Sequence, residues 1–396
     1  MNTTKSSVHL LRTLAELSTV SALWPALDEE LSFRSERLGL RDCEDALARA
    51  EEVVVYGAGD FARSVLDAWN DRSVPVRYLV DTNKNKWGSV WQGYPVKSPE
   101  EIRQASARTL VVVACMDVVG ISTLLEKIGV PFVYAERDGT VGALPGHLIA
   151  RSRAECERVA AGLADDRSRF VFLSVLLARM FQEFNFPMRG NLFTDRCASY
   201  PQYFPEDLFL VQEGECFVDC GVFDGDSLTS FAIEAWRRGV RNWSALGFEA
   251  DGENAERARY NLAARGLSDI PIECTAIGTG EENIGSLHLH NCRGEVIEGS
   301  STSSALDRAL EGHRPTLIKM DIEGAEIPAL IGACGVIKRE RPKLAVCTYH
   351  STAELFQNPL FLKDNHPFYN VFMRHHKAGS LWETVCYAVP KEGRAK

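Results

Sequence analysis

The sequence predicts an α/β protein with two domains joined by a helical linker. Two stretches of the chain alternate short apolar runs of strand length with amphipathic helical patterns, and this alternation is typical of parallel sheets. Between them, over residues 144–210, strand patterns are absent. With 396 residues the chain also exceeds one average domain. We expect a helical segment at 1–50, a first α/β domain at 51–143 and a second at 211–396.

The first domain is outlined by four apolar runs. Leu10, Leu14, Leu17 and Val20, and later Ala46 and Leu47, give the preceding segment a helical period. Predicted strands then follow at 53–56, 76–80, 110–114 and 132–134, with helices near 62–69, 99–105 and 121–128. A short strand–helix repeat of this kind predicts a small parallel sheet covered by helices.

The second domain repeats the pattern with more strands. We expect them at 216–220, 245–249, 272–276, 317–321, 344–349, 369–373 and 384–389, the last two as a hairpin-like pair. In the linker, 154–164 and 170–184 have helical spacing, and 191–208 is aromatic and irregular. We expect the linker at 144–210 to pack on both α/β units and to form part of a substrate lid, with a plain spacer as the alternative.

Charge and cysteine usage exclude several classes of protein. The net charge of −10 argues against a nucleic-acid partner, because phosphate binding requires concentrated positive charge. Eleven cysteines include no C-x-x-C pair, so neither a zinc site nor a thioredoxin-like motif is indicated. No apolar stretch reaches the roughly 18 residues of a membrane span, and charged residues interrupt the N-terminus as no signal peptide would. We expect a soluble, cytoplasmic protein.

The turn after the first strand of the second domain is acidic and glycine-rich. Gly221 follows the strand directly and allows a ligand to approach the backbone, while Gly225 permits the turn into the next helix. Asp219, Asp224 and Asp226 suit a cationic ligand, such as the sulfonium and ammonium groups of S-adenosylmethionine, better than a pyrophosphate. A purely structural turn of the same composition is the alternative.

Further candidate ligand contacts follow the next three strands. Glu249, 28 residues after Gly221, can accept both hydroxyls of a ribose, or else it caps the following helix. Backbone groups around Ala276 and Ile277 can receive an adenine ring. The fourth strand runs into Asp321-Ile322-Glu323-Gly324-Ala325-Glu326. Three acids this close repel one another and destabilise the fold, so a purely structural role for all three is disfavoured.

These motifs together resemble the FkbM family of methyltransferases. The stretch from Lys319 to Glu326 is similar to the family's K-x-D-I-E-G-x-E motif, and Asp219-x-Gly221 with Asp224-Gly225 resembles its first motif. Phe248-Glu249, the Tyr349-His350 pair and Trp382-Glu383-Thr384 resemble later segments, over about 175 residues in the expected order. Val222 and Phe223 depart mildly from the pattern. The resemblance implies a seven-stranded class I methyltransferase sheet, S-adenosylmethionine as cofactor, and methylation of hydroxyl groups, often on sugars.

Methyl transfer requires an aligned acceptor and removal of its proton. Asp321, Glu323 and His350 are our candidates for the base or for orienting the acceptor, and the same acids could instead hold a divalent metal ion. The spacing does not choose between these roles. His288-x-His290 and His375-His376 are interpreted as surface or core histidines.

The first domain carries an outline of the dinucleotide fingerprint. Gly57-Ala58-Gly59 follows a strand, Ala62 replaces the third glycine, and Asp81 ends the next strand. Together with the segment at 81–100, this resembles the N-terminal domain of PglD-like sugar acetyltransferases and implies a Rossmann-like fold that binds nucleotide-linked sugars. A degenerate structural domain and a nicotinamide site are the alternatives.

The sequence therefore predicts an S-adenosylmethionine-dependent O-methyltransferase that acts on a hydroxyl of a sugar or polysaccharide precursor, a small-molecule or glycan substrate that could be nucleotide-linked. One alternative is a nicotinamide-dependent oxidoreductase using the first domain, and another is a non-catalytic nucleotide-binding protein. Neither the acceptor nor the oligomeric state follows from the residues.

Overall fold

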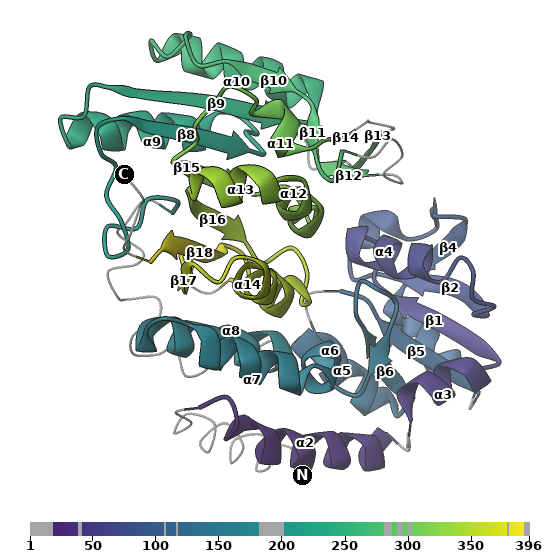
Figure 1. Ribbon diagram of the computed structural model, residues 1–396. Helices are drawn as coiled ribbons and strands as arrows, with labels where there is room; N and C mark the ends of the chain where they lie inside the picture. Colours follow the sequence, from purple (N-terminus) through teal and green to yellow (C-terminus); the bar gives the residue numbers. More distant parts are fainter. Residues whose placement is uncertain are drawn as a thin grey trace. The chain divides into compact units, whose positions relative to one another are not determined.

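The computed structural model shows an α/β protein with two seven-stranded sheets (Figure 1). It describes residues 19–38, 42–106, 108–115, 118–181, 202–280, 287–290, 296–299, 303–377 and 380–391. Contacts divide the chain into unit 1, residues 1–157 with 173–188, and unit 2, residues 158–172 with 189–396. Within the described residues, no helix has the length and apolar character needed to cross a membrane.

Unit 1 has the strand order β3-β4-β2-β1-β5-β6-β7. Its strands are β1 (Glu52–Tyr56), β2 (Val76–Val80), β3 (Val90–Trp91), β4 (Tyr94–Lys97), β5 (Thr109–Val113), β6 (Phe132–Ala135) and β7 (Val141–Gly142). The predicted parallel core is confirmed. The short strands β3, β4 and β7 were not predicted; β3 and β7 pair antiparallel at the two edges and make the sheet mixed.

Helices cover both faces of the unit 1 sheet, because alternate residues of β1 point to opposite sides. Val53 and Val55 pack with α4 (Asp60–Ala68), whereas Val54 and Tyr56 pack with α5 (Val118–Ile128) and the 3-10 helix η2 (Pro99–Gln104). The other helices ahead of the second sheet are α2 (Leu23–Leu38), α3 (Cys43–Arg49), η1 (Lys84–Lys86), α6 (His147–Arg151), α7 (Arg153–Gly162) and α8 (Asp166–Phe181). The apolar positions 10, 14 and 17 lie outside the described residues.

Unit 2 has the strand order β10-β9-β8-β15-β16-β18-β17. These strands are β8 (Glu215–Cys220), β9 (Trp243–Glu249), β10 (Ile272–Cys274), β15 (Leu317–Met320), β16 (Lys343–Cys347), β17 (Tyr369–His375) and β18 (Thr384–Pro390). All seven predicted strands are present, and β17 and β18 form the expected antiparallel pair. Short strands β11 (Ala276–Ile277), β12 (Leu287–His290), β13 (Val296–Gly299) and β14 (Ser303–Ser304) form two further pairs.

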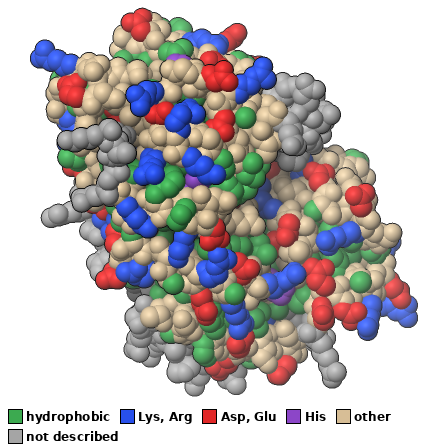
Figure 2. Space-filling model, in the orientation of Figure 1, with side chains coloured by type: hydrophobic (Ala, Val, Ile, Leu, Met, Phe, Trp, Pro, Cys, Tyr) green, Lys and Arg blue, Asp and Glu red, His purple; other side chains and the backbone are tan. Residues whose placement is uncertain are grey.

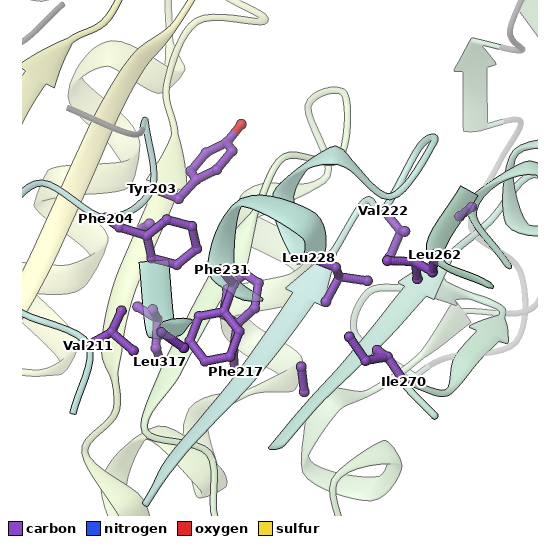
Figure 3. Packing of buried hydrophobic residues seen from close by; sticks show 14 of the residues in the cluster. Tyr203, Phe204, Val211, Phe217, Val222, Leu228, Phe231, Leu262, Ile270 and Leu317 are labelled. Atoms are coloured by element: carbon purple, nitrogen blue, oxygen red, sulfur yellow. The ribbon is translucent and has the colours of Figure 1, made fainter. Parts of the chain in front are cut away.

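One face of the unit 2 sheet is covered by α9 (Asp226–Arg237) and α10 (Gly252–Ala264), which share a hydrophobic cluster with the central strands. Within it, the rings of Phe204, Phe217 and Phe231 pack at centroid distances of 4.9–5.7 Å (Figure 3). The remaining helices are α11 (Leu306–Ala309), α12 (Glu326–Gly332), α13 (Cys334–Glu340) and α14 (Glu354–Asn365). This core fixes the central strands, whose ends carry the candidate site.

The segment before α8 is attached to the free edge of the unit 2 sheet. Leu163 forms a parallel bridge with Val371 of β17, and the amide of Ala164 donates to the Val371 carbonyl at 2.8 Å. Next to this bridge Arg374, only 2% exposed, forms ion pairs with Asp165 at 2.7 Å and with Asp207 at 2.9 Å. Residues 158–172 of the predicted linker therefore belong structurally to unit 2.

Candidate active site

A cavity of about 270 Å³ opens at the carboxyl ends of β8, β9 and β15. The ends are level because Cys220 pairs with Phe248 on one side and with Met320 on the other. The cavity is lined by Tyr203, Gly221, Phe223, Asp226, Ser227, Phe248, Glu249, Ala250, Asn254, Thr275, Ala276, Ile277, Lys319, Asp321, Ile322, Glu323 and Ala325. Six predicted site residues, Gly221, Glu249, Ala276, Ile277, Asp321 and Glu323, thus line one cavity.

Gly221 is required by the contact between two loops of the cavity wall. Its φ is +87°, and a Cβ placed there would lie 1.9 Å from the carbonyl oxygen of Asp321. We expected this glycine to leave room for a ligand; in the structure it also makes room for the backbone that follows β15. Gly225 has a left-handed φ of +88° at the start of α9 and, like Asp224, is not among the residues lining the cavity.

Asp219 lies behind the cavity wall. Its side chain is fully buried, and its Oδ1 lies 2.8 Å from Nζ of Lys319, which is 2% exposed and also donates to the Gly221 carbonyl. Burial opposes the charged form of Lys319, but the carboxylates of Asp219 and Asp321 raise its pKa above the usual value. The ion pair joins β8 to β15 and neutralises Asp219, so the charge facing a ligand comes from other acids.

Glu249 ends β9 with both carboxylate oxygens already oriented. Oε2 accepts a hydrogen bond from the Phe223 amide at 2.8 Å, and Oε1 accepts one from the Asp251 amide at 2.9 Å. The cap of α10 is Asp251, whose side chain accepts from the Asn254 amide. Each oxygen of Glu249 retains a further lone pair for a hydroxyl donor. The carboxylate is therefore held in place at the cavity wall.

Asp321 is the most heavily contacted acid of the site. Its two oxygens accept hydrogen bonds from the hydroxyls of Tyr203 at 2.9 Å and Tyr349 at 2.8 Å, and Nε2 of His350 lies 3.1 Å from Oδ1. Although burial opposes its charge, His350, Lys319 and Tyr349 hold the pKa of Asp321 well below the usual range. An acid held so firmly in the ionised form accepts a proton poorly and is suited to orienting other groups.

His350 stands between carboxylates on both sides of its ring. Besides the contact with Asp321, Nδ1 lies 3.2 Å from Glu326 and 3.6 Å from Glu354, and Nε2 lies 3.8 Å from Glu323. Burial lowers the pKa of His350, but the surrounding carboxylates raise it well above its usual value. Glu323, with its side chain 46% exposed, adopts a left-handed φ of +57°.

Several residues of this network were not singled out from the sequence. Tyr203 comes from the irregular stretch before β8; its ring packs on the core while its hydroxyl points away from it, toward Asp321 (Figure 3). Glu354 lies four residues after His350, a spacing that does suggest contact at a helix start. Glu383 hydrogen-bonds Gln202, and burial together with nearby Asp321 raises its pKa.

The residues predicted for a nucleotide in unit 1 lie together at the end of β1. Gly57 has φ +126° and a Cβ there would lie 2.5 Å from the Ala114 carbonyl oxygen, while the space beside Gly59 is open. Asp81 accepts a hydrogen bond from the Ala58 amide at 3.0 Å and pairs with Lys86 at 3.0 Å. Asp81 thus contacts the loop itself, and the nucleotide site stays a prediction.

The two histidine pairs singled out from the sequence do not line the cavity among the residues that the structure describes. His375 is buried, and its ring nitrogens lie 2.8 Å from Thr384 Oγ1 and 2.6 Å from the Lys377 carbonyl oxygen, so it is a hydrogen-bonded core residue. His376 contacts the hydroxyl of Tyr387 at 2.8 Å. The side chains of His288 and His290 lie outside the described residues.

On the face of the molecule shown in Figure 2, basic and acidic side chains are interspersed.

Comparison with known proteins agrees with this geometry. Residues 219–378 match the model of the methyltransferase FkbM domain, whereas no curated protein sequence matches the chain. The fold is similar to that of the methyltransferase FkbM from Methylobacillus flagellatus, with 20% identity, a TM-score of 0.58, and coverage of 92% of this chain and 99% of that one.

Two further structures resemble part of the chain. An O-methyltransferase from Bacillus cereus in complex with SAH has 16% identity and a TM-score of 0.31, covering 45% of this chain and 74% of its own. Fibrillarin from Aeropyrum pernix, with S-adenosyl-L-methionine bound, has 12% identity and a TM-score of 0.30, covering 46% and 69%. Residues 219–378, which run from the end of β8 past β17, therefore carry a methyltransferase FkbM domain, and the chain has the fold of an FkbM methyltransferase.

Proposed function

We propose that this enzyme transfers the methyl group of S-adenosylmethionine to a hydroxyl of a sugar or polysaccharide precursor. The observation that carries the proposal is the acidic cavity at the ends of β8, β9 and β15, in which Asp321 is fixed by two tyrosines and a histidine. The family resemblance supplies the acceptor class, since FkbM methyltransferases often modify sugars.

The charge of the cavity suits the methyl donor. Asp226, Glu249, Asp321 and Glu323 line it, whereas the one lining lysine, Lys319, is paired with Asp219. An excess of carboxylates favours a cation over a phosphate. In this proposal Glu249 binds the ribose hydroxyls and the backbone near Ala276 receives the adenine. The donor supplies an electrophilic methyl group on its sulfonium.

The residues beside the donor have two further roles in this proposal, which are to orient the acceptor and to accept its proton. We assign Asp321 and His350 to orienting the acceptor, because the low pKa of Asp321 and the raised pKa of His350 make both poor proton acceptors. Glu323 is our candidate for accepting the hydroxyl proton, since its partly exposed carboxylate lines the cavity on a left-handed backbone. Such strained backbone is common where function fixes a side chain.

Calorimetric titration tests the donor site. We expect the folded enzyme to bind S-adenosylmethionine and Glu249→Ala to bind about 10–100-fold more weakly, because it loses charge-assisted hydrogen bonds to the ribose. Glu256→Ala, an exposed glutamate of α10, is the matched control and should bind like the wild type. Because Glu249 also holds two backbone amides, Glu249→Gln and thermal melting separate a lost contact from a disturbed loop. Unchanged affinity in both Glu249 variants rejects the ribose contact.

The acceptor class is tested by transfer of an isotope-labelled methyl group. Free sugars, nucleotide-linked sugars and polysaccharide fragments form the panel, because unit 1 is predicted to bind a nucleotide-linked group. We expect label in a product whose new bond is a methyl ether. Label found only in amines, with donor binding intact, contradicts O-methylation.

A further inference from the structure

Phe223 is a large apolar side chain that lines the cavity and yet is 44% exposed. It lies in the turn between β8 and α9, where its backbone has a left-handed φ of +54°. Side chains with a Cβ adopt this conformation at a cost in energy, which glycine avoids. Exposure to water and backbone strain both disfavour a phenylalanine here, so the fold alone does not explain it.

The backbone around Phe223 is held from two other elements. Its amide donates a hydrogen bond to Oε2 of Glu249, at the end of β9, at 2.8 Å. The carbonyl of the next residue, Asp224, accepts one from the side chain of Asn261 in α10, also at 2.8 Å. The ring of Phe223 is therefore carried by a fixed turn and lies next to the carboxylate of Glu249.

One side chain of the protein packs over the ring. The guanidinium of Arg257 lies 5.6 Å from the ring centroid, and its Nη2 donates to Oδ1 of Asn254 at 3.0 Å. Asn254 is itself 2% exposed and lines the cavity. A guanidinium over an aromatic ring covers one face at most, which leaves the other face for a second group.

We propose that Phe223 covers the adenosine part of the methyl donor. This inference rests on the proposed function, in which Glu249 binds the ribose hydroxyls. The amide of Phe223 and the ribose then share one carboxylate, so the ring lies beside the ribose. Ribose carbons and the adenine ring both present apolar surface to an aromatic side chain. Covering them removes apolar area of the ligand and of Phe223 from water, and this stabilises the complex.

The arrangement of the strands favours adenosine over the sulfonium as the partner of the ring. Phe223 is held from β9 and α10. The acids Asp321 and Glu323, which attract the positive sulfonium, follow β15 on the other side of β8. A ring on the β9 side therefore lies closer to the ribose than to the transferred methyl group.

Calorimetric titration of the full-length protein with two ligands tests this inference. S-adenosylmethionine and S-adenosylhomocysteine share the adenosine, but only the first has the positive sulfonium. We expect Phe223→Ala to weaken both by the same factor of about ten, since roughly half of a phenylalanine side chain is left to be covered. Phe223→Tyr keeps the ring and should bind both within about twofold of the wild type.

Two further variants separate a lost ligand contact from other effects. Tyr260→Ala removes an aromatic side chain of α10 that is 75% exposed and does not line the cavity, so it should bind like the wild type. Phe223→Asn has no ring but suits the left-handed backbone. It should bind as weakly as Phe223→Ala, with a melting temperature no lower than that of the wild type.

The outcomes distinguish this inference from the proposed function. A folded wild type that binds neither ligand rejects both. If the wild type binds both ligands, the donor site stands, and the cover is rejected by an unchanged affinity in Phe223→Ala or by wild-type affinity in Phe223→Asn. A loss confined to S-adenosylmethionine would place the ring against the sulfonium and would likewise overturn the contact with adenosine.

Discussion

Gly214 and Gly221 flank β8 and illustrate two different reasons for a glycine. Both have left-handed φ values, +81° and +87°, but a Cβ at Gly214 meets nothing within 4 Å. At Gly221 it meets the backbone of Asp321, which cannot move aside as a flexible side chain can. The two positions therefore separate the cost of backbone conformation from the cost of a steric clash.

Alanine at each position measures these costs. We expect Gly214→Ala to lower the free energy of unfolding by about 1 kcal/mol, the left-handed penalty alone. Gly221→Ala should lower it by about 3 kcal/mol or more, since strain and clash add, and should also weaken binding of S-adenosylmethionine. Urea denaturation and calorimetry give both quantities. Equal losses of stability in the two variants would contradict the proposed close approach of the loops.

The site residues that the sequence predicted are those that directly follow a predicted strand. Gly221, Glu249 and Asp321 come directly at strand ends, and parallel pairing brings such positions to one edge of the sheet. Tyr203 and the pairing of Lys319 with Asp219 depend on tertiary packing, which single-sequence periodicity does not encode. Asp219 was interpreted as one of the acids that face a cationic ligand, but its position inside a central strand buries it beside Lys319.

At the scale of elements, the length of a strand determined whether the sequence could predict it. Long apolar strands such as β8 and β9 have a clear period, whereas β3 and β7 have two residues each and no period to detect. The attachment of residues 163–168 to β17 could not be predicted from the sequence either, because the pairing partners lie about two hundred residues apart. This attachment covers a sheet edge that would otherwise expose unpaired backbone groups.

Arg374 anchors that attachment, and its removal should destabilise unit 2. Arg374→Met leaves Asp165 and Asp207 without their buried partner, for which we expect a loss of about 3 kcal/mol in the free energy of unfolding. Arg158→Met is the control: Arg158 pairs with Asp364 at 2.8 Å, but both side chains are more than half exposed. Its loss should be below about 1 kcal/mol. Chemical denaturation followed by tryptophan fluorescence compares them, and similar losses would show that the anchor contributes little.

At the scale of the whole molecule, buried acids make opposite contributions to stability as pH changes. Arginine partners lower the pKa of Asp165 and Glu234 against the effect of burial, so their stabilisation is present above about pH 4 and is lost as the pH falls through their folded values. Asp219 behaves in the opposite way, because burial outweighs Lys319 and raises its pKa to about 6.

Between about pH 4 and pH 6 the folded chain therefore keeps a proton on Asp219 that the unfolded chain has released. The free energy of unfolding should fall as the pH rises through this window, by about 3 kcal/mol for this one group. Asp219→Asn removes the titration and retains the other acids, so their contributions cancel in the difference. We expect the stability of the wild type relative to Asp219→Asn to decline from pH 4 to pH 7 in denaturation series. A difference that instead rises with pH would mean that Lys319 outweighs burial and that the pair joining β8 to β15 is fully ionised throughout this range.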